Sequence, residues 1–179
     1  MKSRKTLLSL FAAALLGVFA WVWLAPAWLK DSPDITLLTI DGEELQLASL
    51  RGQPLLLTFW ATSCPGCIRE MPHLIELYEE LSPQGLEVIG VAMSYDKPSH
   101  VLSMRKARNI PYPVALDIHG AAAQAFGNVR LTPTSFLISP DGRIVSQKIG
   151  EMDMPKLRNN ILTMLQQASV NQHQEAGDS

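Results

Sequence analysis

Cysteine and net charge are both scarce in this chain of 179 residues. Two cysteines are too few for a small domain held by several disulfides, and they do not supply the four ligands of a structural zinc site. A formal net charge of −2 offers no basic surface, so no nucleic-acid partner is expected. Hydrophobic residues make up 47% and charged residues 18%, a composition that excludes a disordered chain.

Charged residues are absent from residues 6–29, which follow the basic residues Lys2, Arg4 and Lys5. Residues 7–29 are long enough to cross a bilayer, which takes roughly 20 residues. The basic tip favours the cytoplasmic side, so the rest of the chain is expected outside, on the periplasmic side of the inner membrane in a bacterium.

A cleaved signal peptide is the alternative, with a small-x-small site at residues 25–27. The apolar run exceeds the usual signal-peptide core of about 7–15 residues, which favours an uncleaved, single-pass anchor. We therefore expect residues 1–29 to form a basic tip and transmembrane anchor, residues 30–168 one exported domain, and residues 169–179 a polar tail.

The exported domain has the pattern of an α/β fold. Residues 55–60 and 86–93 are apolar runs of strand length, and residues 65–81 recur at helical spacing, with Glu70 on the polar face. Turn residues Asp41 and Gly42 predict an early hairpin. The other predicted elements are a hairpin over 35–40 and 44–48, helices over 99–108, 121–126 and 154–168, and strands over 113–116, 135–138 and 143–149.

The two cysteines, Cys64 and Cys67, lie where a predicted buried strand turns into a helix. This context is typical of a redox-active CxxC pair. Unpaired amide groups at the start of a helix stabilise a thiolate and lower the pKa of Cys64, which makes it the expected nucleophile. Cys67, one turn inward, suits the resolving role. Pro65 presets the first helical turn, and Gly66 leaves the sulfurs open to a partner chain.

Other uses of the two cysteines remain open at this point. A structural disulfide across so short a loop would constrain little chain entropy. Copper binding by the two thiolates, with a side chain such as His73, is also chemically possible. Neither alternative explains why the pair sits at a strand–helix junction.

Four motifs in order resemble the thioredoxin fold, and specifically the membrane-anchored TlpA/ResA/CcmG-like thiol–disulfide oxidoreductases. They occupy residues 50–54, 59–67, 69–72 and 132–142. The resemblance covers about residues 32–167. It implies a thioredoxin-like mixed central sheet flanked by helices, with an N-terminal β-hairpin extension and one N-terminal transmembrane helix.

The resemblance also implies roles for particular residues. Thr132 and Pro133 should form a cis peptide bond and line the substrate groove beside the cysteines. Glu70 matches an acidic residue that could exchange a proton with Cys67, and Trp60 should pack beside the active-site turn. Thr58 stands where thioredoxins carry a buried Asp, so Thr58 cannot serve as the proton carrier.

These observations predict an exported protein-disulfide reductase that needs no cofactor beyond its own Cys64–Cys67 disulfide. The resemblance implies apocytochrome c or copper-oxidase assembly proteins as clients, and a DsbD/CcdA-type membrane thiol transporter as electron donor. The alternatives are a disulfide-forming oxidase or isomerase, and a copper-binding chaperone that uses the same cysteines. A peroxidase fits the CxxC spacing less well.

Overall fold

A computed structural model describes residues 31–177, with side chains up to residue 170. Its centre is a five-stranded sheet in the order β5-β4-β3-β6-β7. β3, β4 and β5 are mutually parallel, β6 pairs antiparallel with β3, and β7 antiparallel with β6. The strands are β1 Thr36–Leu38, β2 Glu44–Gln46, β3 Leu55–Trp60, β4 Glu87–Ala92, β5 Val114–Leu116, β6 Thr134–Ile138 and β7 Ile144–Ile149. The predicted mixed sheet is confirmed.

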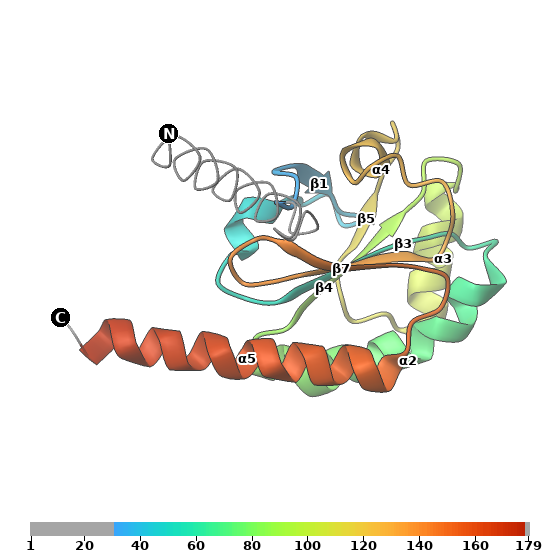
Figure 1. The fold of residues 1–179 in the computed structure, drawn as a ribbon. Coiled ribbons are helices and arrows are strands. Elements are labelled where there is room, and N and C mark those ends of the chain that lie inside the picture. Colours follow the sequence, from blue (N-terminus) through green and yellow to red (C-terminus); the bar gives the residue numbers. More distant parts are fainter. Residues whose placement is uncertain (1–30, 178–179) are drawn as a thin grey trace, which may run out of the picture.

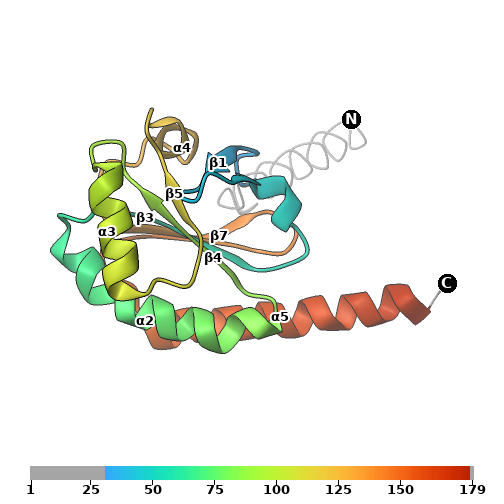
Figure 2. The same ribbon diagram turned by 180° about the vertical axis from the view of Figure 1, so that it is seen from behind.

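Helices cover both faces of this sheet, as Figures 1 and 2 show. α2 and α5 pack on one face, while α4 and the β1–β2 hairpin pack on the other. The helices are α2 Pro65–Leu81, α3 Pro98–Arg108, α4 Ala121–Ala125 and α5 Met154–Gly177, with single 3-10 turns at Leu47–Leu50 and Ser82–Gln84.

β3 lies at the centre because all six of its residues are apolar or able to form a buried hydrogen bond. Every one of them is buried. Alternate side chains point to opposite faces of a strand. Leu57 and Phe59 therefore enter one core and Leu56 and Trp60 the other. The parallel crossover through α2 follows directly, so the cysteine pair lies at the carboxyl end of the central strand.

The predicted N-terminal hairpin is present but shorter than expected. β1 and β2 form a separate two-stranded sheet. The second strand ends at Gln46 because the chain turns into a 3-10 helix at Leu47. The hairpin is joined to the edge strand β5 through a bridge between Thr39 and Ala115. It therefore extends one face of the domain without widening the central sheet.

The closing helix is longer than the sequence pattern predicted. We expected it to end at Ala168, where its apolar face stops, but α5 continues to Gly177. No Gly or Pro interrupts the chain between Pro155 and Gly177, so nothing in the backbone ends the helix earlier. Loss of an apolar face is therefore a poor marker of where this helix ends.

The predicted transmembrane anchor and basic tip lie outside the described residues. Across residues 31–177, no helix combines the length and the apolar character needed to cross a membrane.

Candidate active site

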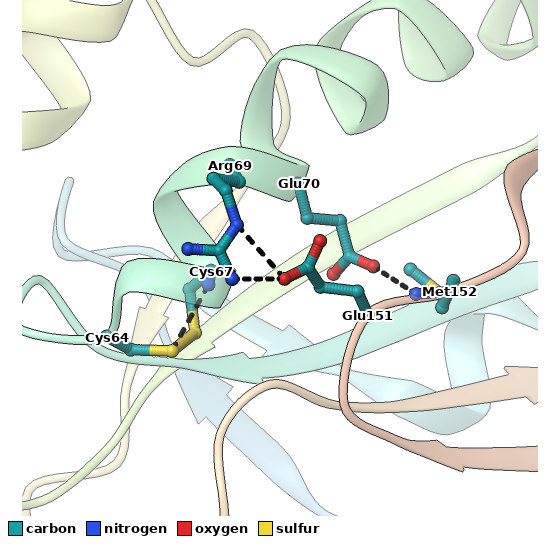
Figure 3. Close-up of polar contacts among 6 residues, drawn as sticks. All are labelled: Cys64, Cys67, Arg69, Glu70, Glu151 and Met152. Carbon is teal, nitrogen blue, oxygen red and sulfur yellow. Dashed lines mark hydrogen bonds and ion pairs between the residues drawn. A yellow bond between two sulfur atoms is a disulfide. The ribbon is translucent and has the colours of Figure 1, made fainter.

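The two cysteines form a disulfide at the first turn of α2 (Figure 3). Cys64 is the N-cap residue, and its Sγ accepts a hydrogen bond from the backbone N–H of Cys67 at 3.2 Å. Pro65 occupies the first turn, as predicted, and is exposed. Cys64 is half-buried and Cys67 is 4% exposed. A partner can therefore reach the first sulfur more readily than the second.

The segment before the disulfide is fixed by a residue that sequence reasoning missed. The Asp96 carboxylate accepts from the backbone N–H of Thr62 at 2.5 Å and from its hydroxyl at 2.7 Å. Asp96 follows β4, the parallel neighbour of β3. Carboxyl ends of parallel strands share one edge of the sheet, and that rule was the available signal.

The cis-proline segment lies beside the cysteines. The Thr132–Pro133 peptide bond is cis, as expected. A Cβ atom added to Gly66 would lie 3.4 Å from Pro133 Cδ, so the Gly66 backbone and the Pro133 ring are close neighbours. Thr132 is half-buried, and its hydroxyl lies 3.4 Å from the hydroxyl of the exposed Tyr95. The structure thus brings Gly66, Thr132 and Pro133 together beside the disulfide, with Pro133 itself buried.

Glu70 is buried, not on the solvent-facing side of α2 as helical spacing alone placed it. Its side chain is 3% exposed, and its carboxylate accepts from the backbone N–H of Met152 at 2.6 Å. Burial raises the pKa of Glu70, the Met152 N–H lowers it, the nearby Glu151 charge raises it, and His73 lowers it. The net direction is upward, because burial is the largest of these effects.

A small pocket connects Glu70 to Cys67. Both residues line it, together with Pro133 and Tyr112. Burial and the Glu70 charge raise the pKa of the Tyr112 phenol, which therefore stays protonated. The complete lining is Thr58, Trp60, Cys67, Glu70, Met71, Leu74, Tyr112 and Pro133. The arrangement places a titratable carboxyl group and the inner sulfur on one shared space.

Trp60 forms part of the wall of this pocket, in keeping with its predicted packing role. Its side chain is 4% exposed, and its indole Nε1 has no hydrogen-bond partner among the described residues. Thr58, which replaces the thioredoxin Asp, accepts a hydrogen bond from the Ser135 hydroxyl at 2.9 Å. A neutral, paired hydroxyl therefore occupies that position.

The residues around the disulfide also form one contact that sequence reasoning did not foresee. Arg69 donates to the Glu151 carboxylate through Nε at 3.1 Å and through a second, shorter guanidinium contact. The Glu151 carboxylate oxygen is 3.4 Å from the position that a Gly66 Cβ would take. No group of three or more His, Cys, Asp or Glu side chains within residues 31–177 is placed to hold a metal ion.

This site has the features of a thioredoxin-fold thiol–disulfide oxidoreductase: one accessible and one buried cysteine at the start of α2, beside a cis-proline. The chain belongs to the AhpC/TSA family, whose model matches residues 29–147. It is 33% identical to the thiol-disulfide oxidoreductase ResA of Bacillus thuringiensis over 129 residues, 72% of this chain and 73% of ResA. It is 32% identical to ResA of Bacillus subtilis over 123 residues, 69% of this chain and 68% of that protein.

Solved structures agree with this assignment. A thiol:disulfide interchange protein from Chlorobium tepidum superposes with a TM-score of 0.71 and 26% identity, covering 78% of this chain and 98% of its own. StoA from Bacillus subtilis superposes with a TM-score of 0.61 and 28% identity, covering 71% and 98%. The protein is therefore an enzyme of the thiol–disulfide oxidoreductase class.

Proposed function

We propose that this enzyme is an exported, membrane-anchored reductase of protein disulfides. The observation that carries the proposal is the asymmetry of the cysteine pair, with an accessible Cys64 and a buried Cys67 that shares a pocket with Glu70. An accessible nucleophile beside a protected resolving thiol suits exchange with a large partner.

The proposed reaction has two exchange steps. The Cys64 thiolate attacks one sulfur of a partner disulfide, which breaks the partner's S–S bond and forms a mixed disulfide. The Cys67 thiol then loses its proton and attacks Cys64 Sγ. The partner leaves with two reduced sulfurs, and the enzyme is left with the Cys64–Cys67 disulfide. Two electrons from a membrane thiol transporter of the DsbD/CcdA type return the enzyme to its dithiol form.

Glu70 is proposed as the base that takes the proton from Cys67. Its raised pKa suits this task, because proton transfer is most efficient when the pKa of the base lies near the working pH. The pocket that both residues line gives the proton a short path, directly or through one water molecule. Its burial keeps the carboxyl group away from bulk solvent.

The surface around the cis-proline is the proposed docking site for partner proteins. Tyr95 and Leu131 are 60% and 61% exposed, and both adjoin Thr132. Exposed apolar side chains grouped beside a reactive centre favour contact with another protein. Apocytochrome c and copper-oxidase assembly proteins are the proposed partners. The anchor in residues 7–29 would raise the effective concentration near membrane-bound partners.

The reduction potential of the Cys64–Cys67 pair tests the direction of electron flow. The full-length chain, in mild detergent, is equilibrated with thiol buffers and the reduced fraction is measured. A value near or below about −230 mV supports a reductase. A value near about −120 mV would make the enzyme a disulfide donor, which is the alternative function.

Trapping variants test the assignment of the two thiols. Cys67→Ser should accumulate a mixed disulfide with a disulfide-containing substrate, since nothing resolves it. The matched Cys64→Ser variant should form far less, because its remaining thiol is buried. The reverse pattern would overturn the assignment of Cys64 as the nucleophile.

A further inference from the structure

The loop between β7 and α5 contacts both halves of the active site. The backbone N–H of Gly150 donates to the Pro133 carbonyl at 2.8 Å. Two residues later, the Met152 N–H donates to the Glu70 carboxylate. Three consecutive residues, 150–152, thus join the cis-proline segment to the active-site helix.

Glu151, between these two backbone contacts, pairs with Arg69 on α2 (Figure 3). Glu151 is 48% and Arg69 63% exposed. Exposed ion pairs contribute little to global folding stability, so an effect of this pair is expected on the local position of the loop. A second ion pair, between Glu80 and Arg158, joins α2 to α5 with similar exposure. It contacts none of the active-site residues, so the two pairs differ in what lies beside them.

Glu70 depends on the position of this loop. Met152 N–H is the only hydrogen-bond donor to its carboxylate among the described residues. An N–H that points at a carboxylate favours the ionised form, so displacement of the loop changes the proton affinity of Glu70. The titratable or charged side chains around Glu70 are Cys67 and His73 of α2, Tyr112 before β5, and Glu151 of the loop, whose carboxylate Arg69 neutralises in part.

We propose that Arg69 and Glu151 are a positioning pair: their ion pair holds the β7–α5 loop so that the Met152 N–H stays on Glu70 and the Pro133 segment stays beside the cysteines. This inference deepens the proposed function, because it rests on Glu70 acting on Cys67. Neither side chain touches the reacting sulfurs in this role. Both act through the backbone that they hold in place.

The variant Glu151→Gln distinguishes an effect of loop position on the pKa of Glu70 from a direct effect of the Glu151 charge. Removing its negative charge alone would lower the pKa of Glu70. Displacing the loop removes the Met152 N–H, which raises that pKa, while Trp60, Leu74 and Tyr112 still line the pocket and keep Glu70 buried. The hydrogen bond has a larger influence on the pKa than the Glu151 charge. Positioning therefore predicts a rise in Glu151→Gln. In Arg69→Gln, loss of the positive charge and loss of the Met152 hydrogen bond both raise the pKa of Glu70. If the pair positions the loop, the pKa of Glu70 therefore rises in both variants.

The experiment titrates the Glu70 carboxyl carbon by NMR in the oxidised, full-length chain labelled with ¹³C-glutamate, in detergent. The Glu70 resonance is assigned by its absence from Glu70→Gln. We expect the titration midpoint to move to higher pH in Glu151→Gln, in Arg69→Gln and in the double variant. Arg158→Gln is the matched control, since it breaks the distant ion pair, and its midpoint should equal that of the wild type.

Charge without positioning gives a different pattern. Midpoints that move in opposite directions in the two single variants, with the double variant near the wild type, would overturn the proposal. Unmoved midpoints in all three would overturn it as well. A matching upward shift in the pH profile of disulfide exchange supports the proposal by an independent readout.

The outcome is distinguishable from a failure of the proposed function. The titration uses the oxidised chain and involves no thiol exchange. If Glu70→Gln exchanged disulfides at the wild-type rate across the pH range, the proposed role of Glu70 would fail whatever the titration shows. If the exchange rate falls in Glu70→Gln but the midpoints stay fixed, only the positioning pair is wrong.

Discussion

The two faces of the central sheet are built for different tasks. On the α4 face, Phe59, Phe126 and Phe136 pack with ring centroids 4.8–6.0 Å apart. The buried Asp117 on that side accepts from the N–H groups of two α4 residues, at 2.9 Å each. The carboxylate of Asp117 therefore serves local structure, and the buried hydrophobic side chains of this face form one apolar cluster.

The α2 face carries buried polar groups within its core. Glu70 is buried with a single donor, and Trp60 Nε1 has no partner among the described residues. A buried polar group without full hydrogen bonding costs folding free energy. We infer that the α4 face supplies stability, while the α2 face gives up some stability for the chemistry beside Cys67.

The largest expected effect breaks the stabilising face. Phe136→Ala removes a ring that contacts both of the other phenylalanines, and we expect a loss of about 3–5 kcal/mol in the free energy of unfolding. Denaturant unfolding of the oxidised chain measures this loss. The reduction potential of the molecules that remain folded should be unchanged, and a shifted potential would contradict the division between the faces.

On the α2 face, by contrast, a substitution is expected to raise the free energy of unfolding, by a smaller amount. Burial raises the pKa of Glu70 above its ordinary value of 4.5, so the folded state holds this proton more tightly than the unfolded state. Stability that depends on Glu70 therefore falls as the pH rises from about 4.5 through the raised pKa. Glu70→Gln should remove that fall and be more stable than the wild type at alkaline pH.

Unfolding free energies of wild type and Glu70→Gln between pH 4 and 9 provide the measurement. Taking the difference between the two proteins cancels the shared contribution of Glu87, whose pKa burial also raises. The advantage of the variant should shrink toward acid pH. An advantage that grows as the pH falls would show that Glu70 is stabilised as the ion.

The smallest expected effect tests how tightly the α2 face is packed. A Cβ atom on Gly90 would lie 3.1 Å from Trp60 Nε1 and 3.3 Å from the Tyr112 ring. Overpacking costs about 1–3 kcal/mol, and the entropy that alanine removes from the unfolded chain offsets about 0.4–1 kcal/mol. Gly90→Ala should therefore lose about 1 kcal/mol by denaturant unfolding. A gain in stability would mean that the Trp60 and Tyr112 side chains can shift to make room for the methyl group.

Much of the fold could be predicted from the sequence because its signals are local. Helix α2 begins at Pro65 and ends at Leu81, as predicted, since the proline at its first position and its apolar stripe are local signals. The end of α5 could not be predicted, because residues after Ala168 carry no apolar periodicity and no helix breaker.

Site residues could be predicted where their spacing in the sequence indicates the chemistry, and not where contacts between distant segments create it. Cys64 and Cys67 could be assigned from their separation and their place after a buried strand. The burial of Glu70 could not, because helical spacing puts it beside exposed residues and the N–H group that donates to its carboxylate lies 82 positions away. Tyr112 and Glu151 were missed for the same reason: their partners are distant in sequence. Asp96 could have been found from its place after β4, the parallel neighbour of β3.

The first described residues and the disulfide lie at opposite ends of the central strand. Asp31 bridges Arg143, just before β7, and Ser32 donates to Gly142. Because Ile144 pairs with Ile138 and Ile138 with Leu55, these residues lie at the start of β3, whereas the cysteines follow its end. The six residues of β3 separate the two poles by about 20 Å. If residues 7–29 hold the protein to a membrane, as we propose, the disulfide is turned away from the lipid. This arrangement then favours partner cysteines that extend clear of the bilayer over cysteines at the headgroup layer.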